Sequence, residues 1–349
     1  MVSMSELLQK HDFSFQKKYG QNFLRDVKIP RRIASECVDT KRAGYSEPGQ
    51  DLTAGSDTVS GKASDTVFSA VSATDSGTVS ASVSETYEPV VPGGGNASGK
   101  IRALMLEIGP GAGILTKELA ARFERVVAVE IDESLRPVLD ESLKECENTS
   151  VVFGDIMETD LHSLLDPLRI APDGTKLPVS VCANLPYYIT TPILMKLIEQ
   201  YDDFDFITVM VQKEVAARLT SVPGKAEYGS ITASINLHSS VKRLFSVPSG
   251  CFFPRPKVDS AVIRLELFKP AKYTERQISG AGKLIKAAFA MRRKTLVNAL
   301  EGILPDLNKA EITRIITEVF GDGSQNVRGE TLGADDFVKL SEAIYGEGR

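Results

Sequence analysis

Residues 106–113 read Leu106-Glu107-Ile108-Gly109-Pro110-Gly111-Ala112-Gly113 and lie between two different apolar patterns. Before them, residues 103–106 form a continuous apolar run, which is typical of a buried strand. After them, Ile114, Leu115 and Leu119 recur at helical spacing. Glycines between a strand and a helix let the backbone approach a ligand closely and leave the helix N-terminus open beneath it. The pattern predicts a strand–turn–helix unit of an α/β sheet, with a ligand at the carboxyl end of the strand.

Acidic residues at the ends of the predicted strands indicate which ligand binds there. The next strand, residues 126–131, contains Glu130 at a position where a carboxylate can take ribose hydroxyls. The glycine turn and Glu130 fit NAD and S-adenosylmethionine equally. Glu107 favours S-adenosylmethionine, because a carboxylate there can hold the cationic methionine end and would be unhelpful beside a pyrophosphate. A third strand, residues 150–153, is followed by Asp155, whose carboxylate can accept the amino group of the donor's adenine.

A fourth strand end carries the motif Asn184-Leu185-Pro186-Tyr187, which follows the apolar run 179–183. The amino group of adenine is a poor nucleophile because its lone pair is delocalised into the ring. The amide oxygen of Asn184 and a nearby backbone carbonyl can accept its two hydrogens and favour the reactive, pyramidal form. Pro186 has no N–H, so this turn presents carbonyls. Tyr187 offers a flat face on which a flipped-out base can stack.

The segment from Cys251 to Ser260 contains the residues Phe252-Phe253-Pro254-Arg255-Pro256 and leads into an alternating strand pattern over 258–267. Two prolines keep its first part extended. Phe252 is a candidate for a second stacking wall opposite Tyr187. It fits equally well as a core aromatic beneath a proline-rich loop.

In their order along the chain, these motifs resemble those of the ribosomal RNA adenine N6,N6-dimethyltransferases of the KsgA type. The resemblance covers nearly the whole chain except one insertion. It extends to residues 17–24, which resemble the family's opening motif that closes over the cofactor, and to Arg292-Arg293-Lys294-Thr295. The other matching segments are residues 107–113, 129–132, 154–156, 184–192, 212–215, 228–229 and 252–260.

The resemblance implies a role for individual residues of this sequence. Residues expected to contact S-adenosylmethionine are Asn22, Leu24, Gly109, Glu130, Asp155 and Asn184. Residues expected to handle the target base are Asn184, Leu185, Tyr187 and Phe252. It also implies an antiparallel last strand in an otherwise parallel sheet.

The order of the motifs divides the chain into four expected parts. Residues 1–43 form a basic arm and a helix of the methyltransferase domain, and 44–100 form a low-complexity insertion that is expected to be disordered. Residues 101–268 form an α/β, Rossmann-like class I methyltransferase sheet, and 269–349 form a small all-helical, RNA-binding domain. The insertion enters at the amino end of the first strand, away from the ligand sites, so it is expected to be dispensable for catalysis.

The formal net charge of −5 is low for a protein that binds RNA, and the insertion accounts for it. Residues 44–100 hold seven acidic and two basic side chains, so the rest of the chain is neutral overall. Basic residues gather in two groups outside the insertion, and local patches decide phosphate binding. These groups are Lys17, Lys18, Arg25, Lys28, Arg31 and Arg32, and Lys283, Lys286, Arg292, Arg293 and Lys294.

The composition indicates the class of protein and its location in the cell. The sequence has no apolar run of membrane-spanning length and no signal-peptide core. Its four cysteines are far apart, and its three histidines form no ligand cluster, so we expect no metal and a cytoplasmic location.

The expected function is S-adenosylmethionine-dependent dimethylation of the N6 amines of two adjacent adenines. The resemblance places them in a hairpin loop near the 3′ end of small-subunit (16S) ribosomal RNA, modified late in subunit assembly by a monomeric enzyme. Two alternatives remain at this point: a large-subunit methyltransferase of the macrolide-resistance type, and a non-catalytic RNA-binding assembly factor. A small-molecule methyltransferase fits less well, because it needs neither the basic groups nor the second domain.

Overall fold

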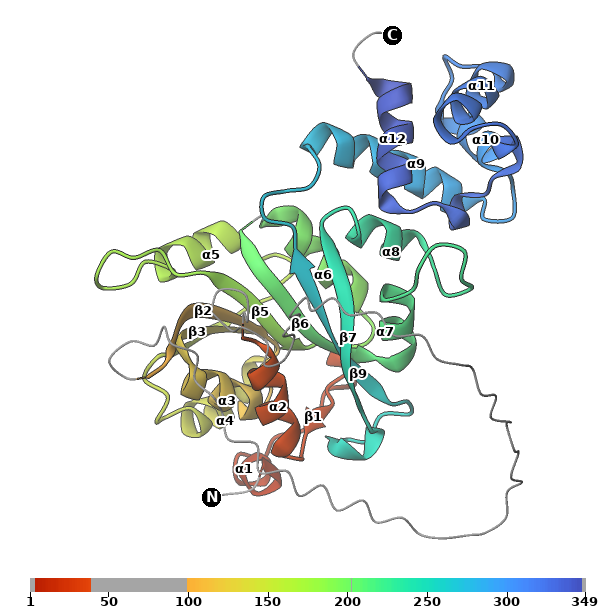
Figure 1. The fold of residues 1–349 in the computed structure, drawn as a ribbon. Coiled ribbons are helices and arrows are strands. Elements are labelled where there is room, and N and C mark those ends of the chain that lie inside the picture. The colour runs from red at the N-terminus through yellow and green to blue at the C-terminus, as the bar shows by residue number, and fades with distance from the viewer. Residues whose placement is uncertain (1–3, 39–98, 202, 347–349) are drawn as a thin grey trace, which may run out of the picture.

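In the computed structural model, which describes residues 4–38, 99–201 and 203–346, a twisted sheet lies below a group of C-terminal helices (Figure 1). The sheet has seven strands in the order β4-β3-β2-β5-β6-β9-β7. All neighbouring pairs are parallel except those of β9, which runs antiparallel to both β6 and β7. The strands are β2 (Ile101–Ile108), β3 (Phe123–Glu130), β4 (Thr149–Phe153), β5 (Val179–Asn184), β6 (Phe204–Gln212), β7 (Ser239–Val247) and β9 (Ser260–Leu267).

Helices cover both faces of the sheet because its central strands are apolar on both sides. In β2, Leu104 and Leu106 pack into one core and Met105 into the other, as the two-residue period of a strand requires. The first core is completed by α5 (Leu161–Leu168), α6 (Thr190–Gln200), α7 (Lys213–Leu219) and α8 (Ser230–Ile235). The second is completed by α2 (Lys28–Glu36) and α3 (Ile114–Arg122).

The N-terminal segment forms an arm that packs against the carboxyl edge of the sheet. It contains α1 (Met4–Lys10), the 3-10 turn η1 (Lys17–Tyr19) and the short strand β1 (Phe23–Leu24). Leu7, Leu8 and Phe23 pack on Val138 and Leu139 of α4 (Arg136–Ser142), which follows the 3-10 turn η2 (Glu133–Leu135). The strand β1 pairs antiparallel with β8 (Phe252–Phe253), which follows η3 (Ser249–Cys251).

The C-terminal helices have their own apolar core, which also takes in Tyr228 beside α8. The longest, α9, begins at a capping box in which Thr274 and Gln277 satisfy each other's backbone N–H groups. The elements are α9 (Glu275–Ala290), α10 (Leu296–Leu300), η4 (Glu301–Ile303), α11 (Lys309–Phe320), η5 (Ser324–Asn326), η6 (Gly329–Thr331) and α12 (Ala334–Tyr345).

The predicted fold is confirmed: a mostly parallel α/β sheet with an antiparallel last strand, followed by a wholly helical region. Observed strand limits differ from the predicted ones by up to three residues, as at β3, which begins at Phe123, and at β4, which begins at Thr149. The predicted insertion 44–100 lies outside the described residues except for Gly99 and Lys100. The division into four parts stays a prediction. Tyr228, Ala233 and Leu237, which come before the predicted boundary at residue 268, pack in the core of the C-terminal helices. None of the helices in the described part is long and apolar enough to cross a membrane.

Candidate active site

The predicted site residues gather at one edge of the sheet. Because β2, β3, β4 and β5 are parallel, their carboxyl ends lie side by side. These ends bring together the glycine turn after Ile108, Glu130, Asp155 and Asn184. The arm and β8 then cover this edge.

The glycine turn adopts a backbone that side chains disfavour. Gly109, Gly111 and Gly113 have φ values of +69°, +58° and +80°. A Cβ built on Gly111 would lie 2.9 Å from Cε1 of Phe23, so the arm packs directly on this turn. A Cβ on Gly109 would meet none of the described atoms within 4 Å, which leaves open space beside its backbone. The turn is therefore packed against the protein at Gly111 and open to a ligand at Gly109.

Glu130 holds the glycine turn in place. Its Oε2 accepts from the N–H of Gly111 at 3.1 Å, and its Oε1 accepts from the N–H of Asp132 at 2.9 Å. Burial raises the pKa of Glu130. Each carboxylate oxygen keeps a second lone pair, so Glu130 can accept ribose hydroxyls while it supports the turn.

Glu107 is an unusual buried carboxyl at the end of β2. It is 1% exposed, and its Oε2 has no hydrogen-bond partner among the described residues. Burial, assisted by the nearby charge of Glu130, raises the pKa of Glu107 to about 8. A cationic ligand would stabilise the ionised form of such a group, because it supplies the missing partner.

Two glutamines fasten the arm to the sheet through Asp132, a link that the sequence did not indicate. Gln21 Nε2 donates to Asp132 Oδ2 at 2.7 Å, and Gln16 Nε2 donates to Asp132 Oδ1 at 3.1 Å. Asp132 is itself buried and also accepts from the N–H of Ser134 at 3.1 Å. These hydrogen bonds attach the arm to the chain two residues beyond Glu130.

Asn22 and Asn184 join the arm to the end of β5. The side-chain amide of Asn184 donates to the carbonyl of Asn22 at 2.9 Å, and that of Asn22 donates to the carbonyl of Gly20 at 2.9 Å. The first bond uses an N–H of Asn184, so its Oδ1 is left to accept from a ligand. Among the described residues, the carbonyl of Leu185 also has no donor, while its N–H donates to Met210 at 3.2 Å.

The two tyrosines after Pro186 differ in their surroundings. Tyr187 is half-buried, its hydroxyl lies 2.6 Å from Oγ of Ser260, and burial raises its pKa. Tyr188 is 60% exposed and lies against Gly20 of the arm. Burial and the charge of Asp155 raise the pKa of Tyr188. The sequence placed Tyr188 and Ser260 within matching segments but assigned neither of them a role in the site.

Phe252 lies in the core beneath the site. It is 1% exposed and packs with Leu24, its partner in the β1–β8 pair. Its neighbour Phe253 is 46% exposed and contacts Phe15 of the arm at 5.4 Å between ring centroids. Phe252 is therefore a core aromatic, which was the second of the two interpretations of this residue. Because it is buried, it can stack on a base only if the β1–β8 pair moves.

A small cavity of about 30 Å³ lies inside this edge of the sheet. Its lining joins predicted cofactor residues to Glu107 and is made of Phe23, Leu24, Glu107, Gly109, Pro110, Gly111, Ala112, Ile114, Leu115 and Asn184. The unpartnered oxygen of Glu107 and the open space at Gly109 fit the methionine end of S-adenosylmethionine. Phe23 and Leu24 of the arm line the cavity, so a movement of the arm would change its size.

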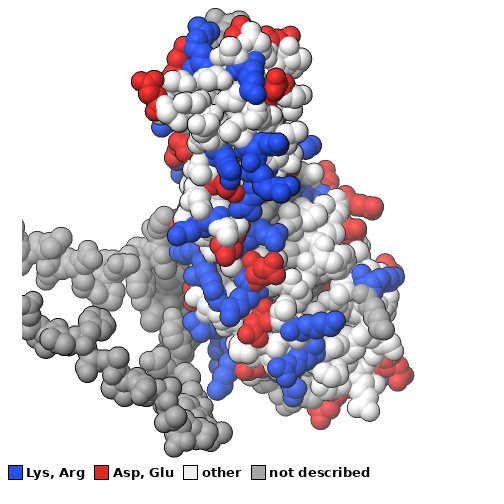
Figure 2. Space-filling view, turned by 90° about the vertical axis from the view of Figure 1, so that its right-hand side faces the viewer, with Lys and Arg blue, Asp and Glu red and all other residues white. Residues whose placement is uncertain are grey.

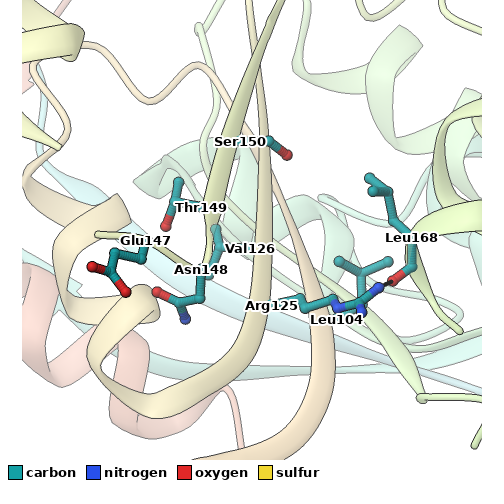
Figure 3. Close-up of a pocket in the computed structure, with 8 residues that line it drawn as sticks. All are labelled: Leu104, Arg125, Val126, Glu147, Asn148, Thr149, Ser150 and Leu168. Atoms are coloured by element: carbon teal, nitrogen blue, oxygen red, sulfur yellow. Dashed lines mark hydrogen bonds between the residues drawn. The ribbon is translucent and has the colours of Figure 1, made fainter. Parts of the chain in front are cut away.

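A larger cavity of about 220 Å³ lies elsewhere (Figure 3). It is lined by Arg125 and Val126 near the start of β3 and by Thr149 and Ser150 at the start of β4. These are the amino ends of the strands, so this cavity is on the opposite edge from the glycine turn. Arg125 donates there to the carbonyl of Leu168 at 2.6 Å, which ties β3 to the end of α5.

Lys and Arg side chains form a band on one face of the molecule, with acidic groups beside it (Figure 2). Arg292, just beyond α9, links the C-terminal helices to the sheet region. It pairs with Glu330 at 2.6 Å and donates to the carbonyl of Ala226, in the loop before α8, at 2.8 Å. Arg293 and Lys294 beside it are exposed.

No group of three or more His, Cys, Asp or Glu that could hold a metal ion occurs among the described residues. The four cysteines are free thiols.

Comparison with known proteins identifies the family. Residues 101–320 match the family described as ribosomal RNA adenine dimethylase. A relative from Bacillus licheniformis, named ribosomal RNA small subunit methyltransferase A, is 34% identical over 345 residues, which cover 98% of this chain and 96% of that protein. The chain belongs to the ribosomal RNA adenine dimethylase family. A relative of the same name from Clostridioides difficile is 35% identical and covers 97% of this chain and 94% of its own length.

Solved structures agree with the class I methyltransferase fold. A dimethyladenosine transferase from Plasmodium falciparum has a TM-score of 0.57 and 25% identity, covering 69% of this chain and 89% of that one. The 23S rRNA methyltransferase ErmE has a TM-score of 0.51 and 24% identity, covering 70% of this chain and 92% of that one. The predictions of the family, the fold and S-adenosylmethionine as cofactor are confirmed.

Proposed function

We propose that this protein dimethylates the N6 amines of two adjacent adenines in a hairpin loop near the 3′ end of small-subunit ribosomal RNA, within the assembling small subunit. The family to which the chain belongs is described as ribosomal RNA adenine dimethylase, and relatives that span nearly the whole chain are named for the small subunit. The observation that carries the proposal is the strand edge where the glycine turn, Glu130, Asp155 and Asn184 meet.

The chain's own residues would hold the cofactor at this edge. Glu107 supplies a carboxyl oxygen for its ammonium group, Glu130 accepts its ribose hydroxyls, and Asp155 accepts its adenine amine. Leu24 and the backbone of Gly109 border the same space, with Asn22 in the arm above. When bound, S-adenosylmethionine supplies an electrophilic methyl group.

Asn184 and Leu185 would orient the target amine. Asn184 Oδ1 and the carbonyl of Leu185 accept its two hydrogens and turn its lone pair towards the methyl group, while Tyr187 stacks on the flipped base. Phe252 forms the second wall once the β1–β8 pair moves. Holding the reactants in line supplies most of the rate enhancement, and no strong base is needed because the methylated amine is acidic enough to lose its proton.

The partner is an RNA held along the basic band of Figure 2. Arg292 braces the junction between the two parts of the protein, and Arg293 and Lys294 are free to contact phosphates there. Under this proposal the protein acts as a monomer in the cytoplasm, where the subunit is assembled.

The large-subunit alternative is not favoured. Relatives that span nearly the whole chain are named for the small subunit, whereas the likeness to ErmE, at 24% identity, speaks for the fold alone. The assembly-factor alternative would not need Glu130, Asp155 and Asn184 together.

The direct test offers labelled S-adenosylmethionine and three substrates to the purified protein: undermethylated small subunits, large-subunit particles and free nucleotides. We expect dimethyladenosine only in the small-subunit RNA. Label in large-subunit RNA would instead support the resistance-type enzyme, and RNA binding without any transfer would support the assembly factor.

A further inference from the structure

Ser260 places a hydroxyl beside the site, and the proposed reaction assigns no role to this hydroxyl. It is the first residue of β9, is fully buried, and lies between Gln212 of β6 and Val247 of β7. Its Oγ lies 2.6 Å from the hydroxyl of Tyr187, which comes from a turn 73 residues earlier in the chain. This contact links the predicted stacking residue to the last strand of the sheet.

We propose that Ser260 is a positioning residue that holds the ring of Tyr187 in the place needed to stack the target adenine. The inference rests on the proposed function, in which Tyr187 carries the base. A tyrosine hydroxyl lies on the axis of the Cβ–Cγ bond, so a hydrogen bond there fixes the position of the ring by restraining rotation about the Cα–Cβ bond, while packing sets the rotation of the ring about its own axis. Without that bond, the half-buried ring is held only by packing, and the target amine is less often in line with the methyl group.

The position of Ser260 is itself fixed from two sides, which makes it a firm anchor. The carbonyl of its neighbour Asp259 accepts from the N–H of Lys213 at 2.9 Å, at the start of α7. The carboxylate of Asp259 accepts from the N–H of Ser249 at 2.9 Å, in the turn that leads to β8. Asp259 and Ser260, at the end of the proline-rich motif, therefore connect the Tyr187 hydroxyl to the start of α7 and to the turn before β8.

Two other buried hydroxyls make no such contact with the site. Thr232 donates to a backbone carbonyl, that of Arg218, at 2.7 Å. Thr208, buried in β6, has no partner for its hydroxyl among the described residues. Ser260 instead meets the hydroxyl of a side chain in the site. Asn184 is held separately, through the carbonyl of Asn22 in the arm. The amine acceptor and the stacking face thus have independent supports.

The test uses the full chain with four variants: Ser260→Ala, Tyr187→Phe, the double variant, and Thr208→Val as a control that removes a buried hydroxyl without a partner. Methyl transfer to undermethylated small subunits is measured in a single turnover, and cofactor Kd and thermal stability are measured beside it. We expect Ser260→Ala and Tyr187→Phe each to slow transfer by about 5- to 10-fold, the effect of one lost hydrogen bond. Cofactor Kd should stay unchanged, and Thr208→Val should transfer at the parent rate.

The double variant decides whether the two hydroxyls act together. If Ser260 acts through Tyr187, the double variant is no slower than either single variant. Full activity in Ser260→Ala, or losses that multiply in the double variant, would overturn the proposal. If Ser260→Ala does not fold, Tyr187→Phe decides alone, since it leaves β9 intact: parent-rate transfer would overturn the anchor.

A fifth variant, Tyr187→Ala, separates this inference from the function on which it rests. An inactive Tyr187→Ala beside a fully active Tyr187→Phe would reject the anchor and keep base stacking. A fully active Tyr187→Ala would reject base stacking by Tyr187 itself.

Discussion

Replacing Glu107 by glutamine should make the ligand-free protein more stable at alkaline pH and make it a poorer binder of S-adenosylmethionine. Glu107 is 1% exposed, and burial raises its pKa from 4.5 to about 8. Between these two values the folded state binds more protons than the unfolded state, so the free energy of unfolding falls as pH rises. At about 1.4 kcal/mol per pKa unit, the loss is at most about 5 kcal/mol by pH 8.

The neutral amide introduced by Glu107→Gln does not ionise, so the variant should escape this loss. The assay is denaturant unfolding of the parent and the variant between pH 5 and 9, with Glu199→Gln on the exposed end of α6 as the control. We expect the stability difference between parent and variant to shift in favour of Glu107→Gln as pH rises, and Glu199→Gln to follow the parent.

Cofactor binding should change in the opposite direction. An ionised Glu107 attracts the ammonium of the cofactor, so the parent should bind more tightly as pH rises through about 8. Calorimetry should show weaker binding and a flatter pH dependence in Glu107→Gln. Equal pH dependence of stability in parent and variant, or an unchanged Kd above pH 8, would refute this account of Glu107.

Three further predictions concern the cover of the site and the insertion. Gly111→Ala should weaken cofactor binding by about tenfold or more, because a Cβ there lies 2.9 Å from Phe23 at a φ of +58°. Gln21→Ala removes the 2.7 Å hydrogen bond to the carboxylate of Asp132, which should reduce the stability of the docked arm by about 1.5–3 kcal/mol. Amide hydrogen exchange in the arm should therefore be faster. A short Gly-Ser linker in place of residues 46–98 should leave methyl transfer at the parent rate, because the insertion joins β2 at its amino end.

Each of these three predictions has a result that would contradict it. Gly282→Ala, in α9 with no atom near its added methyl, should bind the cofactor normally, and equal binding by Gly111→Ala would contradict the packing argument. If amide hydrogens of the arm exchange as slowly in Gln21→Ala as in the parent, aromatic packing, such as the 5.2 Å Phe15–Phe23 contact, is enough to hold the arm in place. Loss of transfer in a folded linker variant would show that the insertion takes part in activity.

The sequence predicted the fold well because its signals are local. The apolar run before Gly109 and the helical spacing after Gly113 specify a strand, a turn and a helix without help from the rest of the chain. Parallel neighbours then bring Glu130 and Asn184 to one edge by topology alone.

Contacts between distant segments could not be predicted in this way. The pairing of Leu24 with Phe252, which buries the latter, joins segments more than 200 residues apart and depends on the finished sheet. The bond from Gln21 to Asp132 likewise follows from where the folded arm lies. Periodicity describes which face a residue occupies, but it carries no information on which distant side chain will meet it.

The most direct test of the central claim compares the parent protein with Asn184→Ala on undermethylated small subunits. If Asn184 orients the target amine, the parent should form dimethyladenosine in small-subunit RNA, while the variant should bind that RNA normally and transfer at least about 100-fold more slowly. Transfer at the parent rate by Asn184→Ala would contradict the claim that this strand edge performs the reaction.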